Sequence, residues 1–149
     1  MIGRMLIPAS LSLLAVVIVL SGCGGPPQVS DEDVQRLLYA KLVEMLEAEG
    51  KREPILVDVR MSARYAKGHL PGAINITVVD LRADHPKLAG KRPIILCSDG
   101  WSAVIGHDDG LSSAAAKKLI TAGYDADRVF DFRGGVDNWV KQGGQLSTD

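Results

Sequence analysis

Short apolar runs alternate along this chain with segments that favour helices. The runs that predict strands lie at residues 54–60, 73–76, 93–97 and 128–132, each bounded by proline, glycine or polar residues. The segments that predict helices lie at residues 62–67, 79–88, 112–122 and 136–141. We expect residues 79–88 to form a short helix and a loop, limited by Pro86. Strands that alternate with helices in this way predict a parallel α/β sheet, which is the strongest restriction on the fold.

An amphipathic segment precedes the first of these strands. Ser30 is followed by three acidic residues, as at the start of a capped helix. Apolar residues then recur from Val34 to Leu46 at the spacing of one helical face, and Gly50 follows. We therefore expect one scaffold helix that begins at Ser30 and ends at Gly50.

The first 22 residues have the pattern of a targeting signal. Arg4 precedes an apolar core at residues 11–20, and small residues lead directly to Cys23. The sequence Leu-Ser-Gly-Cys that ends at Cys23 resembles the bacterial lipobox, in which the cysteine is lipidated and becomes the first mature residue. We expect a signal peptide over residues 1–22 and a lipidated tether over 23–29. An ordinary secretory signal or an uncleaved anchor is the alternative.

The residue after Cys23 bears on location. Gly24 stands where an Asp would resemble an inner-membrane retention signal. We expect a cell-envelope protein held to the membrane by lipid on Cys23, facing the periplasm from the outer membrane if the source is Gram-negative. The formal net charge is −1, so no basic surface points to nucleic acid as a partner.

Cys97 is the second of two cysteines and the only thiol left if Cys23 is lipidated. A lone thiol in an exported protein is either reactive or intermolecular. Cys97 ends a predicted strand, and a predicted helix begins downstream at Ser112. This position favours a thiolate with a depressed pKa. A buried structural cysteine is the alternative.

Four motifs in this order resemble the rhodanese (thiosulfate sulfurtransferase) domain family. They are residues 56–60, residues 68–76 (Gly-His-Leu-Pro-Gly-Ala-Ile-Asn-Ile), Cys97, and residues 132–139 with their Gly-Gly pair and Trp139. The resemblance implies a doubly wound sheet of about five mainly parallel strands with helices on both faces. It places the domain at residues 30–144 and leaves 145–149 as a tail. It also implies structural roles for His69, Gly72 and Gly135.

The resemblance implies that Cys97 is the catalytic nucleophile. Its thiolate would take sulfane sulfur from thiosulfate, polysulfide or a persulfide donor and pass it to a thiol or cyanide acceptor. The residues expected to bind substrate through the loop backbone are Ser98, Asp99, Gly100, Trp101 and Ser102. Nothing in the sequence points to a cofactor or a metal, and the run His107-Asp108-Asp109 is interpreted as a solvated loop tip.

The chain departs from the family pattern in the loop after Cys97. This loop is longer by residues 101–109, contains no Arg or Lys, and has Leu111 at the family Arg position. Its three acids, Asp99, Asp108 and Asp109, are expected to repel the thiosulfate dianion. Without the Arg that would grip the oxyanion, phosphatase chemistry is not expected. Arg64 also replaces a common acid, so Arg60 is expected to lack its usual partner.

Two functions therefore remain open. The first is a lipid-anchored sulfurtransferase that works through a Cys97 persulfide. The second is a non-catalytic binding or sensing module that meets a ligand or a protein partner through the inserted loop, residues 101–111.

Overall fold

The computed structural model describes residues 28–50, 53–90, 92–102, 107–108 and 110–149. The predicted signal peptide, Cys23 and most of the predicted tether lie outside these ranges. Within them, no helix has the length and apolar character that crossing a bilayer requires.

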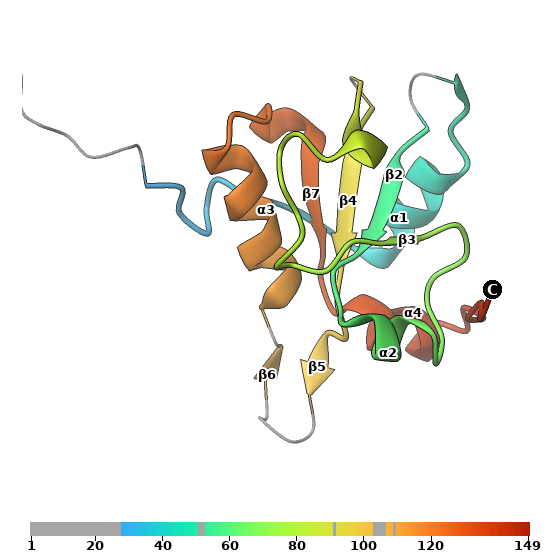
Figure 1. Ribbon diagram of the computed structural model, residues 1–149. Helices are drawn as coiled ribbons and strands as arrows, with labels where there is room; N and C mark the ends of the chain where they lie inside the picture. Colours follow the sequence, from blue (N-terminus) through green and yellow to red (C-terminus); the bar gives the residue numbers. More distant parts are fainter. Residues whose placement is uncertain (1–27, 51–52, 91, 103–106, 109) are drawn as a thin grey trace, which may run out of the picture.

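Five parallel strands form the central sheet, in the order β1-β7-β4-β2-β3 (Figure 1). The strands are β1 (Gln35–Leu37), β2 (Ile55–Asp58), β3 (Ile74–Asn75), β4 (Ile94–Cys97) and β7 (Val129–Phe132). Four of them coincide with the predicted apolar runs. The predicted α/β fold with a parallel sheet is confirmed.

Helices cover both faces of the sheet, as expected. One face packs against α3 (Leu111–Thr121), whose Ala115, Ala116 and Leu119 are buried. The other face packs against α1 (Tyr39–Leu46), α2 (Ser62–Tyr65) and α4 (Gly135–Lys141). Alternate residues of β4 divide between the two cores, so Leu96 faces the α3 side and Cys97 faces the other side.

The helix predicted to begin at Ser30 is wrong in its first half. Residues Gln35–Leu37 form β1, an edge strand that pairs with β7, and α1 begins only at Tyr39. The Arg133 N–H also donates to the Leu37 carbonyl. Val34 and Leu37 are three residues apart and lie in the cores on opposite faces of the sheet. In extended chain this spacing serves both cores, whereas in a helix it would have placed both residues on one face. The exposed backbone edge of β7 decides this outcome, because its polar groups need partners.

The short helix predicted between Val79 and Leu88 is also mostly wrong. The segment forms turns and then a 3-10 helix, η2 (Pro86–Leu88), which Pro86 begins rather than limits. The His85 ring accepts a hydrogen bond from the Lys87 N–H at its start. A second 3-10 helix, η3 (Ala126–Arg128), leads into β7. Buried Leu81 and Leu88 anchor the 79–88 segment to the core.

The insertion after Cys97 contains two short antiparallel strands, β5 (Trp101–Ser102) and β6 (His107–Asp108). Figure 1 shows this hairpin beyond the carboxyl end of the sheet, next to the start of α3. The insertion therefore extends from the edge at which parallel α/β sheets place their sites.

Candidate functional site

Cys97 is the last residue of β4 and is completely buried. Its side chain belongs to the apolar cluster on the α1 and α4 face, which includes Leu56, Ala73 and Phe132. The position at a strand end was predicted correctly. The thiol has no solvent-exposed surface, however, because it is packed within this cluster.

Residues 98–100, which follow this end of β4, dock on the start of α4. The Val136 N–H donates to the Ser98 carbonyl at 2.9 Å, and the Asp137 N–H donates to the Asp99 carbonyl at 3.0 Å. Gly100 has a φ of +92°, and a Cβ there would overlap the Gly134 carbonyl. Carbonyl groups of the loop thus bind the first turn of α4, and the two segments are held in close contact.

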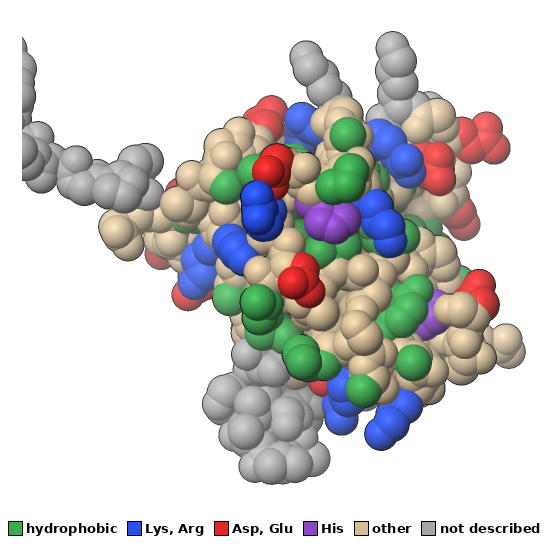
Figure 2. Space-filling view, in the orientation of Figure 1, with side chains coloured by type: hydrophobic (Ala, Val, Ile, Leu, Met, Phe, Trp, Pro, Cys, Tyr) green, Lys and Arg blue, Asp and Glu red, His purple; other side chains and the backbone are tan. Residues whose placement is uncertain are grey.

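A cluster of four charged side chains lies beside this contact, and we call it the Arg60 cluster. Asp58 is fully buried, and the 5% exposed Arg60 pairs with it at 2.6 Å. Arg60 Nη1 also donates to Asp99 at 2.9 Å, while its Nη2 donates to the Gly68 carbonyl at 2.8 Å. Arg64, on α2, reaches the other oxygen of Asp99 at 2.8 Å. Cationic side chains are visible at the surface around α2 in Figure 2.

The Arg60 cluster bears on two sequence-based expectations. Position 64 offers Arg60 no acid, as expected, but Arg60 binds two other carboxylates and a backbone carbonyl. Asp99 is not an isolated repelling charge, since two guanidinium groups bind it. Burial alone would raise the pKa of Asp99, but hydrogen bonds from Arg64 and Arg60 hold it below its usual range.

The expected depression of the Cys97 pKa is contradicted. Burial raises the pKa of the thiol well above its ordinary value, and the nearby carboxylate of Asp58 raises it further. The guanidinium of Arg60 lowers the pKa, but burial and the carboxylates, including those of Asp131 and Asp99, outweigh it. In this conformation Cys97 is a neutral thiol at physiological pH.

The other predicted substrate-binding residues divide into two groups. Ser98 is buried, and its Oγ lies 3.3 Å from the Ser112 Oγ at the start of α3. Gly100 is buried as well, and Asp99 belongs to the Arg60 cluster. Trp101 and Ser102 form β5 in the hairpin. The contacts of Asp99 with Arg60 and Arg64 were not predicted from the sequence. The local signal was that Asp58 and Arg60, two residues apart at the end of β2, can form an ion pair.

His69 has structural contacts of the kind that the sequence predicted. Its buried ring stacks on Tyr65, with ring centroids 3.7 Å apart, and Nδ1 lies 3.1 Å from the Tyr65 carbonyl. Its backbone pairs with Ser147 of the predicted tail. Gly72 and Gly135 have φ values of +75° and +49°, which agrees with the structural roles expected of them.

The described residues contain no group of three His, Cys, Asp or Glu side chains arranged to hold a metal ion. Asp109, the last residue of the run His107-Asp108-Asp109, lies outside the described ranges.

Comparison with known proteins places this geometry in context. A family model described as a rhodanese-like domain matches residues 39–142. The chain is similar to the BH2092 protein of Bacillus halodurans, with 28% identity, a TM-score of 0.58 and 72% of each chain covered. It shares its fold with a thiosulfate sulfurtransferase of Pseudomonas aeruginosa, at 20% identity and a TM-score of 0.61, over 78% of this chain and 21% of that one.

A curated relative adds a partial match. An HTH-type transcriptional regulator of Mycobacterium tuberculosis is 38% identical over 65 residues. These residues make up 44% of this chain but only 29% of the regulator, so the match spans less than a third of that protein.

Proposed function

Because the chain belongs to the rhodanese-like domain family, we propose that it is a sulfurtransferase that carries sulfane sulfur on Cys97. The observation that best supports this is the place of Cys97 at the carboxyl end of β4. The loops that follow such strand ends hold the substrates of parallel α/β enzymes. The buried guanidinium of Arg60 is the cation that favours a thiolate at this position.

The proposed reaction has two steps. The Cys97 thiolate attacks the outer sulfur of a donor such as thiosulfate, and the S–S bond of the donor breaks as the Cys97 persulfide forms. Sulfite leaves with the electron pair of that bond. An acceptor thiolate or cyanide then attacks the outer sulfur of the persulfide, which releases the Cys97 thiolate and the sulfurated acceptor. No cofactor takes part in either step.

The buried, protonated thiol must first become accessible. The contact of residues 98–100 with the start of α4 directly follows Cys97 in the chain, and it consists of two backbone hydrogen bonds and the Gly100–Gly134 packing. In our proposal the donor reacts after this contact opens. Water that then enters lowers the pKa of Cys97 by removing the desolvation that raises it.

The Arg60 cluster affects which donors are accepted. Arg64 is 59% exposed and neutralises Asp99, so it offsets the charge that we expected to repel thiosulfate. Arg64→Ala should reduce turnover of thiosulfate by about fivefold, equivalent to ~1 kcal/mol for a partly exposed pair. Turnover of a neutral organic trisulfide should change little. Lys67→Ala, which removes an exposed cation at the end of the same segment, is the matched control.

The persulfide itself is the direct test of the proposed function. The full chain and its Cys23→Ala and Cys97→Ala variants are incubated with thiosulfate or polysulfide, and intact masses are measured. We expect a gain of one or more sulfur atoms in the wild type and in Cys23→Ala, reversed by dithiothreitol, and no gain in Cys97→Ala. No adduct from any donor, even above pH 9, would refute sulfur transfer through Cys97.

One observation favours a second function. Cys97 has no exposed surface and a raised pKa, as expected of a structural cysteine in a non-catalytic module. Such a module would bind a protein partner or ligand through the inserted loop, residues 101–111. The absence of a sulfur adduct, together with a partner whose binding is lost when the loop is shortened, would establish this alternative.

We also propose that the protein is anchored in the cell envelope through lipid on Cys23. The apolar core at residues 11–20 and the small residues before Cys23 support this placement. Metabolic labelling with a radioactive fatty acid tests it. The wild type should be labelled and Cys23→Ala should not, whereas an unlabelled wild type or a labelled variant would contradict lipidation.

A further inference from the structure

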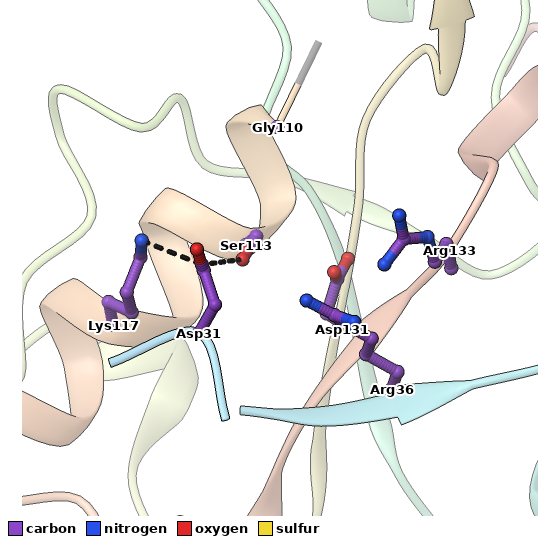
Figure 3. Close-up of a pocket in the computed structure, with 7 residues that line it drawn as sticks. All are labelled: Asp31, Arg36, Gly110, Ser113, Lys117, Asp131 and Arg133. Atoms are coloured by element: carbon purple, nitrogen blue, oxygen red, sulfur yellow. Dashed lines mark hydrogen bonds and ion pairs between the residues drawn. The ribbon is translucent and has the colours of Figure 1, made fainter. Parts of the chain in front are cut away.

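A pocket of about 310 Å³ lies between α3 and the strands β1 and β7, on the face of the sheet opposite the Cys97 side chain. We call it the α3 pocket. The residues that line it are Asp31, Arg36, Gly110, Ser113, Lys117, Asp131 and Arg133 (Figure 3). None of the proposed sulfur-transfer steps uses these residues.

Two arginines of the α3 pocket are available to a ligand. Arg36 projects from β1, and Arg133 follows the last residue of β7, so the sheet register places both on the α3 face. Both residues are exposed. Within the described part of the chain, neither guanidinium forms an ion pair or a side-chain hydrogen bond, so the donors of both remain available to a ligand in the pocket.

The acids of the pocket do not cancel these charges. Lys117 binds Asp31 at 2.8 Å, and the Ser113 hydroxyl donates to the same oxygen at 3.3 Å. The hydrogen bond and charge of Lys117 hold the pKa of Asp31 below its ordinary value. Asp131 is 5% exposed. Among the described residues, the lining contains three cationic and two acidic side chains, so its net charge is positive, and Arg36 and Arg133 are its exposed cations.

The geometry points to a binding site for a compact oxyanion, such as a phosphate group, held by Arg36 and Arg133. Guanidinium groups bind tetrahedral oxyanions through paired N–H donors. The amino end of α3 borders the same space, and Gly110 at its N-cap has no side chain to occupy it. The positive end of the helix dipole therefore adds to the attraction.

Phosphate at this site can come from solution or from a lipid headgroup. Asp31 is eight residues beyond Cys23, and eight extended residues span at most about 28 Å. If Cys23 is lipidated as we propose, the pocket lies within reach of the headgroups of the membrane. Both sources present the same chemical group to the two arginines, so one pair of substitutions tests both.

The first experiment measures binding of inorganic phosphate and sulfate to the full chain in detergent, by calorimetry at constant ionic strength. The Arg36→Ala/Arg133→Ala double variant should bind at least about tenfold more weakly, because two charged hydrogen-bond donors are lost. Arg82→Ala removes an exposed arginine that pairs with Asp84 outside the pocket, and it should bind as the wild type does. Asp31→Asn should bind more tightly, because it releases Lys117 from its partner.

The second experiment measures cosedimentation with vesicles of phosphatidylglycerol or phosphatidylcholine, using the Cys23→Ala chain with and without the two arginine substitutions. Binding to phosphatidylglycerol vesicles that the double substitution abolishes identifies the headgroup as the source. Equal binding of both chains to every ligand, or no binding to phosphate, sulfate or vesicles, overturns the proposal. Either result is independent of whether Cys97 carries sulfur, since no step of the assay involves the thiol.

Discussion

Two charged clusters lie on opposite faces of the sheet and differ in how they satisfy their charges. The Arg60 cluster is closed, because Asp58, Arg60 and Asp99 bind one another and Arg64 completes the set. The α3 pocket is open, because Arg36 and Arg133 have no partner among the described residues. One cluster holds the loop after Cys97 in place, and the other offers donors to a ligand.

Burial explains the difference. Asp58 is fully buried and Arg60 nearly so, and a buried charge without a partner costs several kcal/mol. The chain therefore surrounds each buried charge with opposite charges and carbonyls. The guanidinium groups of the α3 pocket face water, which solvates them at little cost and can be displaced by an anion. A closed cluster thus suits a scaffold, whereas an open one suits binding.

The largest expected effect comes from opening the closed cluster. Arg60→Ala removes the guanidinium from the buried Asp58 carboxylate, which keeps only the backbone N–H of residue 60, and it leaves the Gly68 carbonyl without this donor. It should therefore reduce the free energy of unfolding by about 3–5 kcal/mol. Arg36→Ala, in the open pocket, should change it by less than about 0.5 kcal/mol. Urea denaturation of both variants measures the contrast. Equal losses would show that the two clusters do not differ as described.

Alanine substitutions of the two glycines that flank the inserted hairpin should show the same contrast, with the larger loss of stability at the closely packed end. Gly100 packs on the Gly134 carbonyl with a φ of +92°, so Gly100→Ala adds a steric overlap to backbone strain. We expect a loss of about 3 kcal/mol. Gly110 borders the open pocket, and a Cβ there meets nothing within 4 Å at a φ of +63°.

Gly110→Ala should therefore cost only the strain, about 1–2 kcal/mol. Thermal unfolding of both variants gives the order. If Gly110→Ala is the more damaging of the two, the close contact between residue 100 and the start of α4 is not what fixes this loop.

The smallest expected effect is the change of stability with pH that the burial of Cys97 causes. Its pKa is raised in the folded state, whereas the unfolded thiol ionises near pH 8.5. Below that pH both states are protonated and the full stability is present. Above it only the unfolded state loses the proton, so stability falls by up to about 1.4 kcal/mol per pH unit until the folded thiol ionises.

Comparison with Cys97→Ala isolates this contribution, since other titrating groups are shared. The difference in free energy of unfolding between the two chains should be constant from pH 7 to pH 8 and should shift against the wild type by pH 10. A difference that stays constant to pH 10 would mean that the Cys97 pKa is not raised.

Much of the fold was predictable because its signals are local. The strands at Ile55–Asp58 and Ile94–Cys97 follow from apolar runs that end in polar turns, and α3 follows from a run of strong helix formers. The turns at Gly72 and Gly135 follow from motif and residue type. Residues 35–37 were predicted incorrectly, because their strand state depends on β7, more than ninety residues away along the chain.

The sequence alone determined the parallel α/β architecture, the family, and the position of Cys97 at a strand end. Periodicity and turn residues encode these features within short stretches of chain. The tertiary structure decided the charge pairs and the state of the thiol. Asp99 meets Arg60 and Arg64 across 39 and 35 residues of sequence, and Cys97 is fully buried in a cluster that includes Val136 of α4. Such contacts depend on where the folded backbone brings distant segments together, which fixes the solvation and hence the pKa of each group.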